Sequence, residues 1–142
     1  MLISCTAPSH QSYAIAVTVR DAYGYNNSDF VLVDVARSEL VAAINGGDRT
    51  ISFSNVVADG LVLDSASYDP DSGDEDGLRF NWSCVVSEGG RPCAAELLPA
   101  ATTAAFLREA GEYEFILTVS KYSRGSWRSA STSATINVAC VL

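Results

Sequence analysis

The feature that most constrains the fold is a strict alternation of apolar and polar side chains over residues 78–84. The apolar positions are Leu78, Phe80, Trp82 and Cys84, and polar residues stand between them. Alternation with a period of two is typical of a β-strand that buries one face. The segment is therefore predicted to place a large indole and a thiol on the same buried face, as an apolar group and a covalent anchor.

Similar patterns recur along the chain, whereas no helical pattern persists for three turns. We expect strands at residues 13–19, 30–35, 40–44, 49–53, 61–63, 78–86, 104–107, 113–119 and 133–138. Residues 100–110 are the best helix candidate and would supply one turn at most. About seven short strands in roughly 100 residues are typical of an all-β, immunoglobulin-like antiparallel β-sandwich. Its predicted core contains Leu63, Phe80, Trp82, Tyr113 and Leu117.

Tyr113 begins the penultimate predicted strand. This is the place of a tyrosine corner, in which the hydroxyl ties the strand back to an earlier connection. The alternative is that Tyr113 is one more core aromatic.

An internal repeat indicates more than one module. The segment YAIAVTV at residues 13–19 matches YEFILTV at residues 113–119, an offset of 113 minus 13, or 100 residues, and the strand that follows repeats as well. A repeat of about one domain length predicts tandem modules. We expect residues 1–36 to be the closing hairpin of an incomplete preceding module, residues 37–39 a linker, and residues 40–139 a complete β-sandwich. The chain is thus expected to be a piece of a larger secreted or membrane-anchored protein.

The charge and hydropathy of the chain disfavour two classes of partner. The formal net charge is -8 at pH 7, so the surface repels the phosphate backbone and no nucleic-acid partner is expected. No apolar run reaches the roughly 18 residues that a membrane helix needs, so this piece is expected not to insert into a membrane.

The four cysteines contain no CxxC pair, and His10 is the single histidine, so a zinc site would have poor ligands. Cys84 and Cys93 bracket a short glycine-bearing loop and are predicted to form a disulfide, with free buried thiols as the alternative. Cys5 and Cys140 are expected to have partners in sequence beyond this piece.

Two asparagines stand in N-glycosylation acceptor sequences. Asn26 lies in a predicted loop, and Asn81 lies on the outward face of a predicted strand. We expect Asn26 to be the better acceptor because loops are accessible.

The turn before residue 78 concentrates carboxylates. The candidate calcium ligands are Asp69, Asp71, Asp74 and Asp76, with Glu75 among them. Clustered carboxylates on a glycine-bearing loop can wrap a calcium ion, although the spacing is not that of an EF-hand. A solvated turn shaped by Pro70 and Gly73 is the alternative, and no other cofactor is expected.

A group of aromatic and arginine side chains marks the last predicted hairpin. The candidate contact patch is Tyr122, Arg124, Trp127 and Arg128. These residue types are enriched in binding hot spots. Covering the edge of the sandwich or packing against an adjacent module is the alternative role.

Catalytic motifs such as GxSxG, the P-loop and HExxH are missing from the sequence, and a serine triad would have to use His10 in the incomplete module. The chain is therefore predicted not to be an enzyme.

Two segments carry a resemblance to a known family. LDSASYDPD at residues 63–71, together with LRFNWSC at 78–84, resembles the signature of polycystic-kidney-disease (PKD) repeats and, more closely, the receptor-for-egg-jelly (REJ) module of polycystin-like proteins. Residues 110–121 are similar to the family's closing strands, and residues 42–47 to its opening. VRDAYG at residues 19–24 looks like a plain PKD repeat, from which the second copy departs at Ser120-Lys121.

The resemblance implies an extracellular immunoglobulin-like sandwich in a large cell-surface protein, with adhesion, ciliary or gamete-surface, or force-bearing roles and no catalytic residues. We therefore expect a non-catalytic structural and adhesion module of a polycystin-like cell-surface or ciliary protein. Its expected partners are neighbouring modules of the same chain and other cell-surface proteins or glycans. The alternatives are a carbohydrate-binding accessory module of a secreted hydrolase and a cytosolic β-sandwich adaptor.

Overall fold

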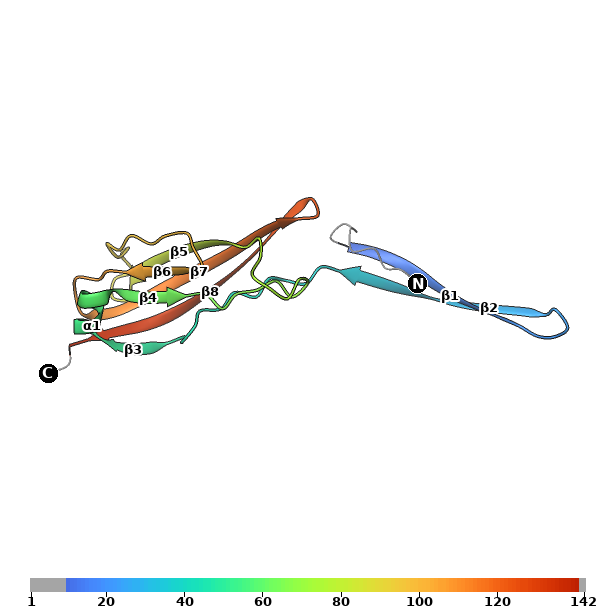
Figure 1. Ribbon diagram of the computed structural model, residues 1–142, viewed down its shortest axis with the longest axis horizontal. Helices are drawn as coiled ribbons and strands as arrows, with labels where there is room; N and C mark the ends of the chain where they lie inside the picture. The colour runs from blue at the N-terminus through green and yellow to red at the C-terminus, as the bar shows by residue number, and fades with distance from the viewer. Residues whose placement is uncertain (1–9, 141–142) are drawn as a thin grey trace. The chain divides into compact units, whose positions relative to one another are not determined.

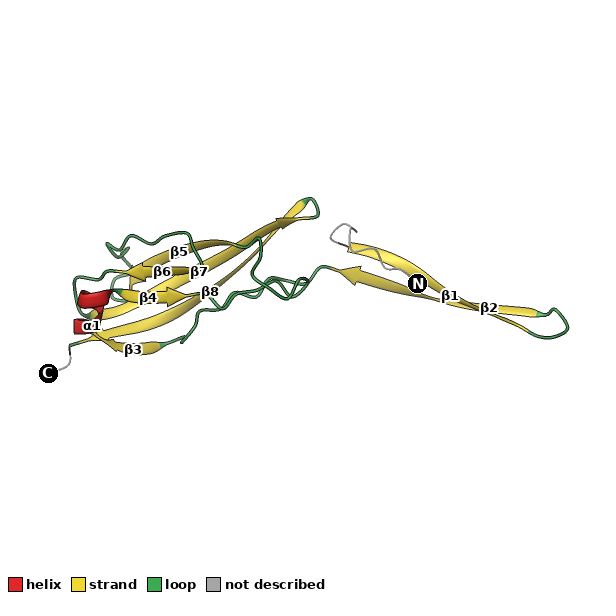
Figure 2. Cartoon of the chain, in the orientation of Figure 1, coloured by secondary structure: helices red, strands yellow, loops and turns green. Residues whose placement is uncertain are grey.

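The computed structural model describes residues 10–140, and these residues form two compact units. The first contains the described residues up to Ser38 together with Ser123–Ser126, and the second contains Glu39–Tyr122 and the described residues from Trp127 onward. In the described part of the chain nearly all regular structure is β-strand, with one short helix (Figure 2). The all-β prediction is therefore confirmed.

The first unit is built on an antiparallel hairpin of β1 (His10–Arg20) and β2 (Asn26–Ala36). Its register pairs Tyr13 with Val33 and Ile15 with Val31. The turn between the strands is held by Asp21, whose carboxylate accepts the backbone N–H groups of Tyr23 and Tyr25.

The second unit contains a four-stranded sheet in the order β3-β8-β7-β5 (Figure 1). Its strands are β3 (Arg49–Ser52), β5 (Arg79–Val86), β7 (Gly111–Ser123) and β8 (Ser126–Ala139). β5 and β7 pair antiparallel, but β3 and β8 pair parallel, with Arg49 opposite Ile136 and Ser52 opposite Ala139. The expectation of antiparallel pairing is wrong for β3, because side-chain alternation carries no information about strand direction.

A two-stranded sheet of β4 (Leu61–Asp64) and β6 (Thr102–Ala105) belongs to the same unit. Residues 100–110, the best helix candidate in the sequence, contain no helical turn. Strand β6 lies here and overlaps the strand predicted at residues 104–107, because its β-branched Thr102 and Thr103 favour a strand. Residues 40–44 form isolated bridges to Tyr68 and Ser65 rather than a continuous strand.

The helix of the unit, α1 (Phe53–Asp59), was not predicted from the sequence. It has seven residues and buries only Val56, so it is too short to display a helical period. Gly60 ends it with a positive φ of 78° and donates its N–H to the Val56 carbonyl at 2.9 Å.

Both sheets of the second unit contribute to one hydrophobic core. Its buried strand residues are Leu61 and Leu63 of β4, Trp82 and Cys84 of β5, Ala105 of β6, Tyr113, Phe115, Leu117 and Val119 of β7, and Ile136 and Val138 of β8. Phe80 is half-buried and packs against this cluster. Trp82 is 6% exposed, and its indole N–H donates to the Ala100 carbonyl at 2.9 Å. The largest side chain of the core is therefore both buried and hydrogen-bonded.

Tyr113 makes the hydrogen bond expected of a tyrosine corner. Its hydroxyl donates to the backbone carbonyl of Glu109 at 2.7 Å. Burial, with the nearby Glu109 carboxylate, raises the pKa of Tyr113, so the group stays a donor.

The Cys84–Cys93 disulfide predicted from the sequence is present, with a Cα–Cα distance of 5.5 Å. The Cys93 N–H also donates to the Cys84 carbonyl at 3.1 Å, and the Val86 N–H donates to the Arg91 carbonyl at 2.8 Å. The disulfide therefore fastens the loop that follows β5 against the end of that strand. Cys140 is exposed and free, and Cys5 lies outside the described residues.

Candidate interaction surface

The distal end of the β7–β8 hairpin presents two aromatic rings. Arg124 and Gly125 form the two-residue turn with φ values of 52° and 81°, the conformation of a type I′ turn. This tight turn places Tyr122 and Trp127 opposite each other on adjacent strands, with ring centroids 5.4 Å apart. Tyr122 is 58% exposed and Trp127 is 53% exposed, so both rings remain available to a partner.

A third strand supplies a cation to this pair. The guanidinium of Arg79, on β5, lies 4.9 Å from the centroid of the Trp127 ring, within cation–π range. We name Arg79, Tyr122 and Trp127 the aromatic surface. The sequence prediction omitted Arg79, since it lies far from the hairpin along the chain.

Arg128 does not belong to this surface, contrary to the predicted contact patch. Neighbouring residues of a strand point to opposite faces, so Arg128 faces away from Trp127. Its guanidinium donates to the Asp69 carboxylate at 2.7 and 3.0 Å and to Asp71 at 3.3 Å. Arg124, which the prediction also included, is exposed in the turn.

The acidic turn and the hairpin meet in a buried ion-pair cluster of Asp69, Lys121 and Arg128. Asp69 is 2% exposed, and its carboxylate lies 2.9 Å from the Lys121 ammonium and 2.7 Å from the Arg128 guanidinium. The hydrogen bonds from Arg128 are the main reason that the pKa of Asp69 lies well below its usual range, and the same pairing raises the pKa of Arg128. The cluster fastens the turn to the hairpin that carries the aromatic surface.

This pairing bears on the calcium prediction. In the described residues, no group of three or more histidine, cysteine, aspartate or glutamate side chains is arranged to hold a metal ion. The carboxylate of Asp69 is occupied by two cationic side chains, and one oxygen of Asp74 accepts from Ser72 and from the backbone of Asp76. The turn is therefore organised by these internal bonds. Calcium binding stays a prediction that the side-chain arrangement of the described turn does not support.

The two predicted glycan acceptors are both exposed. Asn26 begins β2, and Asn81 lies on the face of β5 opposite the core. Glycosylation at either residue stays a prediction.

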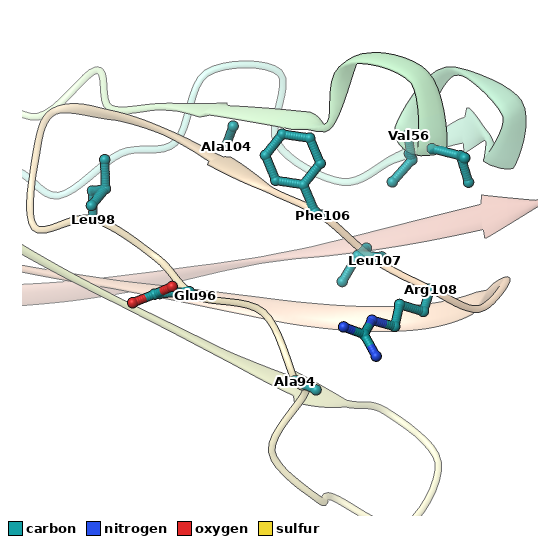
Figure 3. Close-up of a pocket in the computed structure, with 9 residues that line it drawn as sticks. Val56, Ala94, Glu96, Leu98, Ala104, Phe106, Leu107 and Arg108 are labelled. Carbon is teal, nitrogen blue, oxygen red and sulfur yellow. The ribbon is translucent and has the colours of Figure 1, made fainter.

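A groove that no sequence motif indicated lies beside β6 (Figure 3). Its volume is about 730 Å³, and its lining is mainly apolar: Val56, Val57, Ala94, Glu96, Leu98, Ala104, Phe106, Leu107 and Arg108. Phe106 packs against the backbone of Gly60, where a side chain would come within 3.1 Å of the ring.

The family model of the REJ domain matches residues 5–140. The chain belongs to the REJ domain family. REJ domains are non-catalytic extracellular modules of polycystin-like proteins, which agrees with the disulfide. No curated protein matches this REJ chain.

The REJ match includes both structural units rather than the second alone. Among the described residues of this REJ domain, no helix has the length and apolar character needed to cross a membrane.

Proposed function

We propose that this chain is a force-bearing structural and adhesion module of a polycystin-like cell-surface or ciliary protein. Membership of the REJ family supports the extracellular and non-catalytic parts of this proposal. The observation that carries the mechanical part is the parallel pairing of β3 with β8.

The second unit has features of an immunoglobulin-like sandwich. Its opening segment bridges from Val41 to Tyr68 and from Ile44 to Ser65, and it then runs on into β3, which pairs with β8 in the four-stranded sheet. The first segment therefore fastens to both sides of a core shared by two sheets, and the Tyr113 corner has the hydrogen bond seen in such folds.

The mechanical argument follows from which strands bear the load. Tension along the polypeptide enters this unit ahead of β3 and leaves after β8, the first and last strands of the unit. Because these strands are parallel, pulling the start of one and the end of the other slides them along each other. Sliding loads the hydrogen bonds of the pair together, whereas peeling breaks them one after another. The pairing of Arg49–Ser52 with Ile136–Ala139 is therefore proposed to be the mechanical lock.

Two further links reinforce the unit against extension. The Cys84–Cys93 disulfide closes a loop between residues nine positions apart. Tension cannot extend this loop unless the disulfide is cleaved. The Asp69 ion pairs join the acidic turn to β7 and β8, far along the chain. Both links would limit how much chain is released before the β3–β8 pair yields.

Stretching single molecules from their two ends tests the proposal. We expect the second unit to unfold in one discrete force peak. Treatment with a reductant should lengthen the released chain by about 25 Å. The nine-residue span between Cys84 and Cys93 becomes extensible at about 3.3–3.6 Å per residue, and the disulfide already bridges 5.5 Å of it. Extension without a force peak would refute a load-bearing role.

The aromatic surface is the proposed site of adhesion, with a cell-surface protein or a glycan as its partner. Exposed tryptophan and tyrosine beside an arginine form the type of anchor that dominates interfaces. A carbohydrate-binding accessory role would use the same two rings, but they form one pair at a hairpin end rather than a row along a sheet. We therefore favour a protein partner.

A further inference from the structure

Hairpin β1–β2 carries an apolar face that the described residues leave largely uncovered. The antiparallel register places seven apolar side chains on this face: Tyr13, Ile15, Val17, Val19, Val31, Val33 and Val35. The polar residues Asn27 and Asp29 share the face. Val17 is 62% exposed and Val19 is 65% exposed. An isolated two-stranded hairpin is marginally stable in water at best, so this face needs an apolar partner.

The second unit contains a copy of this hairpin, in which the equivalent face is buried. Val17 and Val19 correspond to Leu117 and Val119, each of which is 0% exposed. Val33 corresponds to Ile136, which is also 0% exposed. The elements that complete this core include β4 and β6, which contribute Leu61, Leu63 and Ala105 to the same cluster.

The correspondence extends to the opposite face of both hairpins. Thr18 and Ser28 share a hydroxyl hydrogen bond of 2.8 Å across β1 and β2. Thr118 and Ser131, at the equivalent cross-strand positions of β7 and β8, share one of 2.7 Å. The two hairpins therefore have the same register and the same inner and outer faces.

We infer that the face of Val17 and Val19 is the inner face of a second sandwich. Its occupant is a short antiparallel sheet of the β4–β6 type, presenting leucine and alanine side chains. This sheet comes from the preceding part of the same polypeptide. The inference rests on the tandem modules that the internal repeat predicts, in which this hairpin closes an incomplete PKD-like module.

The test compares two lysine substitutions on adjacent residues of β1, in the natural protein that includes about one further repeat length upstream. Val17→Lys places a cation on the inferred inner face, opposite Asp29, where a free hairpin would tolerate or favour it. Thr18→Lys places the same cation on the outer face, opposite Ser28. Hydrogen exchange of the β1–β2 amides is the readout, and the amides of β5, β7 and β8 report whether the second unit stays folded.

We expect Val17→Lys to accelerate β1–β2 exchange at least 100-fold and Thr18→Lys to change it less than threefold. Equal effects of the two substitutions would overturn the inference. A doubled molecular mass in solution, lost in Val17→Lys, would also overturn it by assigning the cover to a second copy. Neither result depends on the force peak of the second unit, so the proposed mechanical role can fail separately.

Discussion

Replacing Asp69 with asparagine should destabilise the second unit more than any other change in the acidic turn. The side chain is 2% exposed, and its carboxylate accepts from Lys121, Arg128 and the backbone N–H of Asp71. An asparagine at this position would keep the shape of the side chain but would leave Lys121 facing a neutral amide and Arg128 with its contact to Asp71.

The magnitude follows from the burial of the three groups. Removing one member of a buried ion pair costs about 3–5 kcal/mol, because the remaining charge is left uncompensated. The side chains of Lys121 and Arg128 are 15% and 14% exposed, so water partly solvates them, and Arg128 keeps its ion pair with Asp71. The lower end of this range therefore applies. We expect a loss of about 3 kcal/mol in unfolding free energy, which for a domain of roughly 100 residues is a decrease of at least about 10 °C in Tm.

Urea denaturation and thermal unfolding of the D69N variant measure this loss. D76N is the matched control, since it removes the same charge from an exposed position in the same turn. D69N and D76N unfolding at the same urea concentration as the parent chain would refute the assignment of Asp69 as the anchor of the turn.

The pH dependence of the unfolding free energy gives an independent check of the same ion pairs. The pKa of Asp69 is depressed in the folded protein, chiefly by Arg128, so its contribution to stability is fully present above the unfolded-state pKa of about 3.9. The contribution is lost as the pH falls further, through the folded pKa. The stability difference between the parent and D69N should therefore stay constant from pH 8 to pH 5 and narrow below about pH 4. A difference that already shrinks between pH 7 and pH 5 would contradict the depressed pKa.

Three further substitutions have defined outcomes. Tyr113→Phe removes the hydrogen bond to Glu109 and should lower the unfolding free energy by about 1 kcal/mol in urea denaturation; no change would mean that the corner contributes nothing. Replacing Cys84 and Cys93 together with alanine opens a loop of about ten residues and should cost about 2–3 kcal/mol, whereas unchanged stability in non-reducing buffer would exclude a structural role. Trp127→Ala should weaken binding to cell-surface partners in a pull-down while Tm is retained, and undiminished binding would exclude the aromatic surface.

Side-chain alternation was sufficient to predict the main strands of the second unit. In β5 and β7 the same residues that alternate in the sequence are buried in the structure, because a strand with one apolar face has one stable orientation. Trp82 and the Cys84–Cys93 pair were found in the same way, since each depends on a local pattern and a short loop.

The features that were missed depend on contacts between distant segments. The sequence assigned Asp69 to a calcium site and Arg128 to a contact patch, yet the two side chains pair with each other across 59 positions of the chain. The cation–π contact between Arg79 and Trp127 likewise joins two strands that are far apart in the sequence. No local pattern reports such pairings, and the parallel direction of β3 is hidden for the same reason.

The most direct test of the account compares two pulling geometries in the second unit. Both attach one handle at Cys140; the other is placed either at Glu39 or at Gly111, the first residue of β7. Pulling from Glu39 slides β3 along β8, whereas pulling from Gly111 peels β8 away from β7, because the start of β7 and the end of β8 are neighbours in the hairpin. We expect a clearly higher unfolding force from Glu39 than from Gly111. Equal forces in the two geometries would contradict the central claim that the β3–β8 pair bears the load.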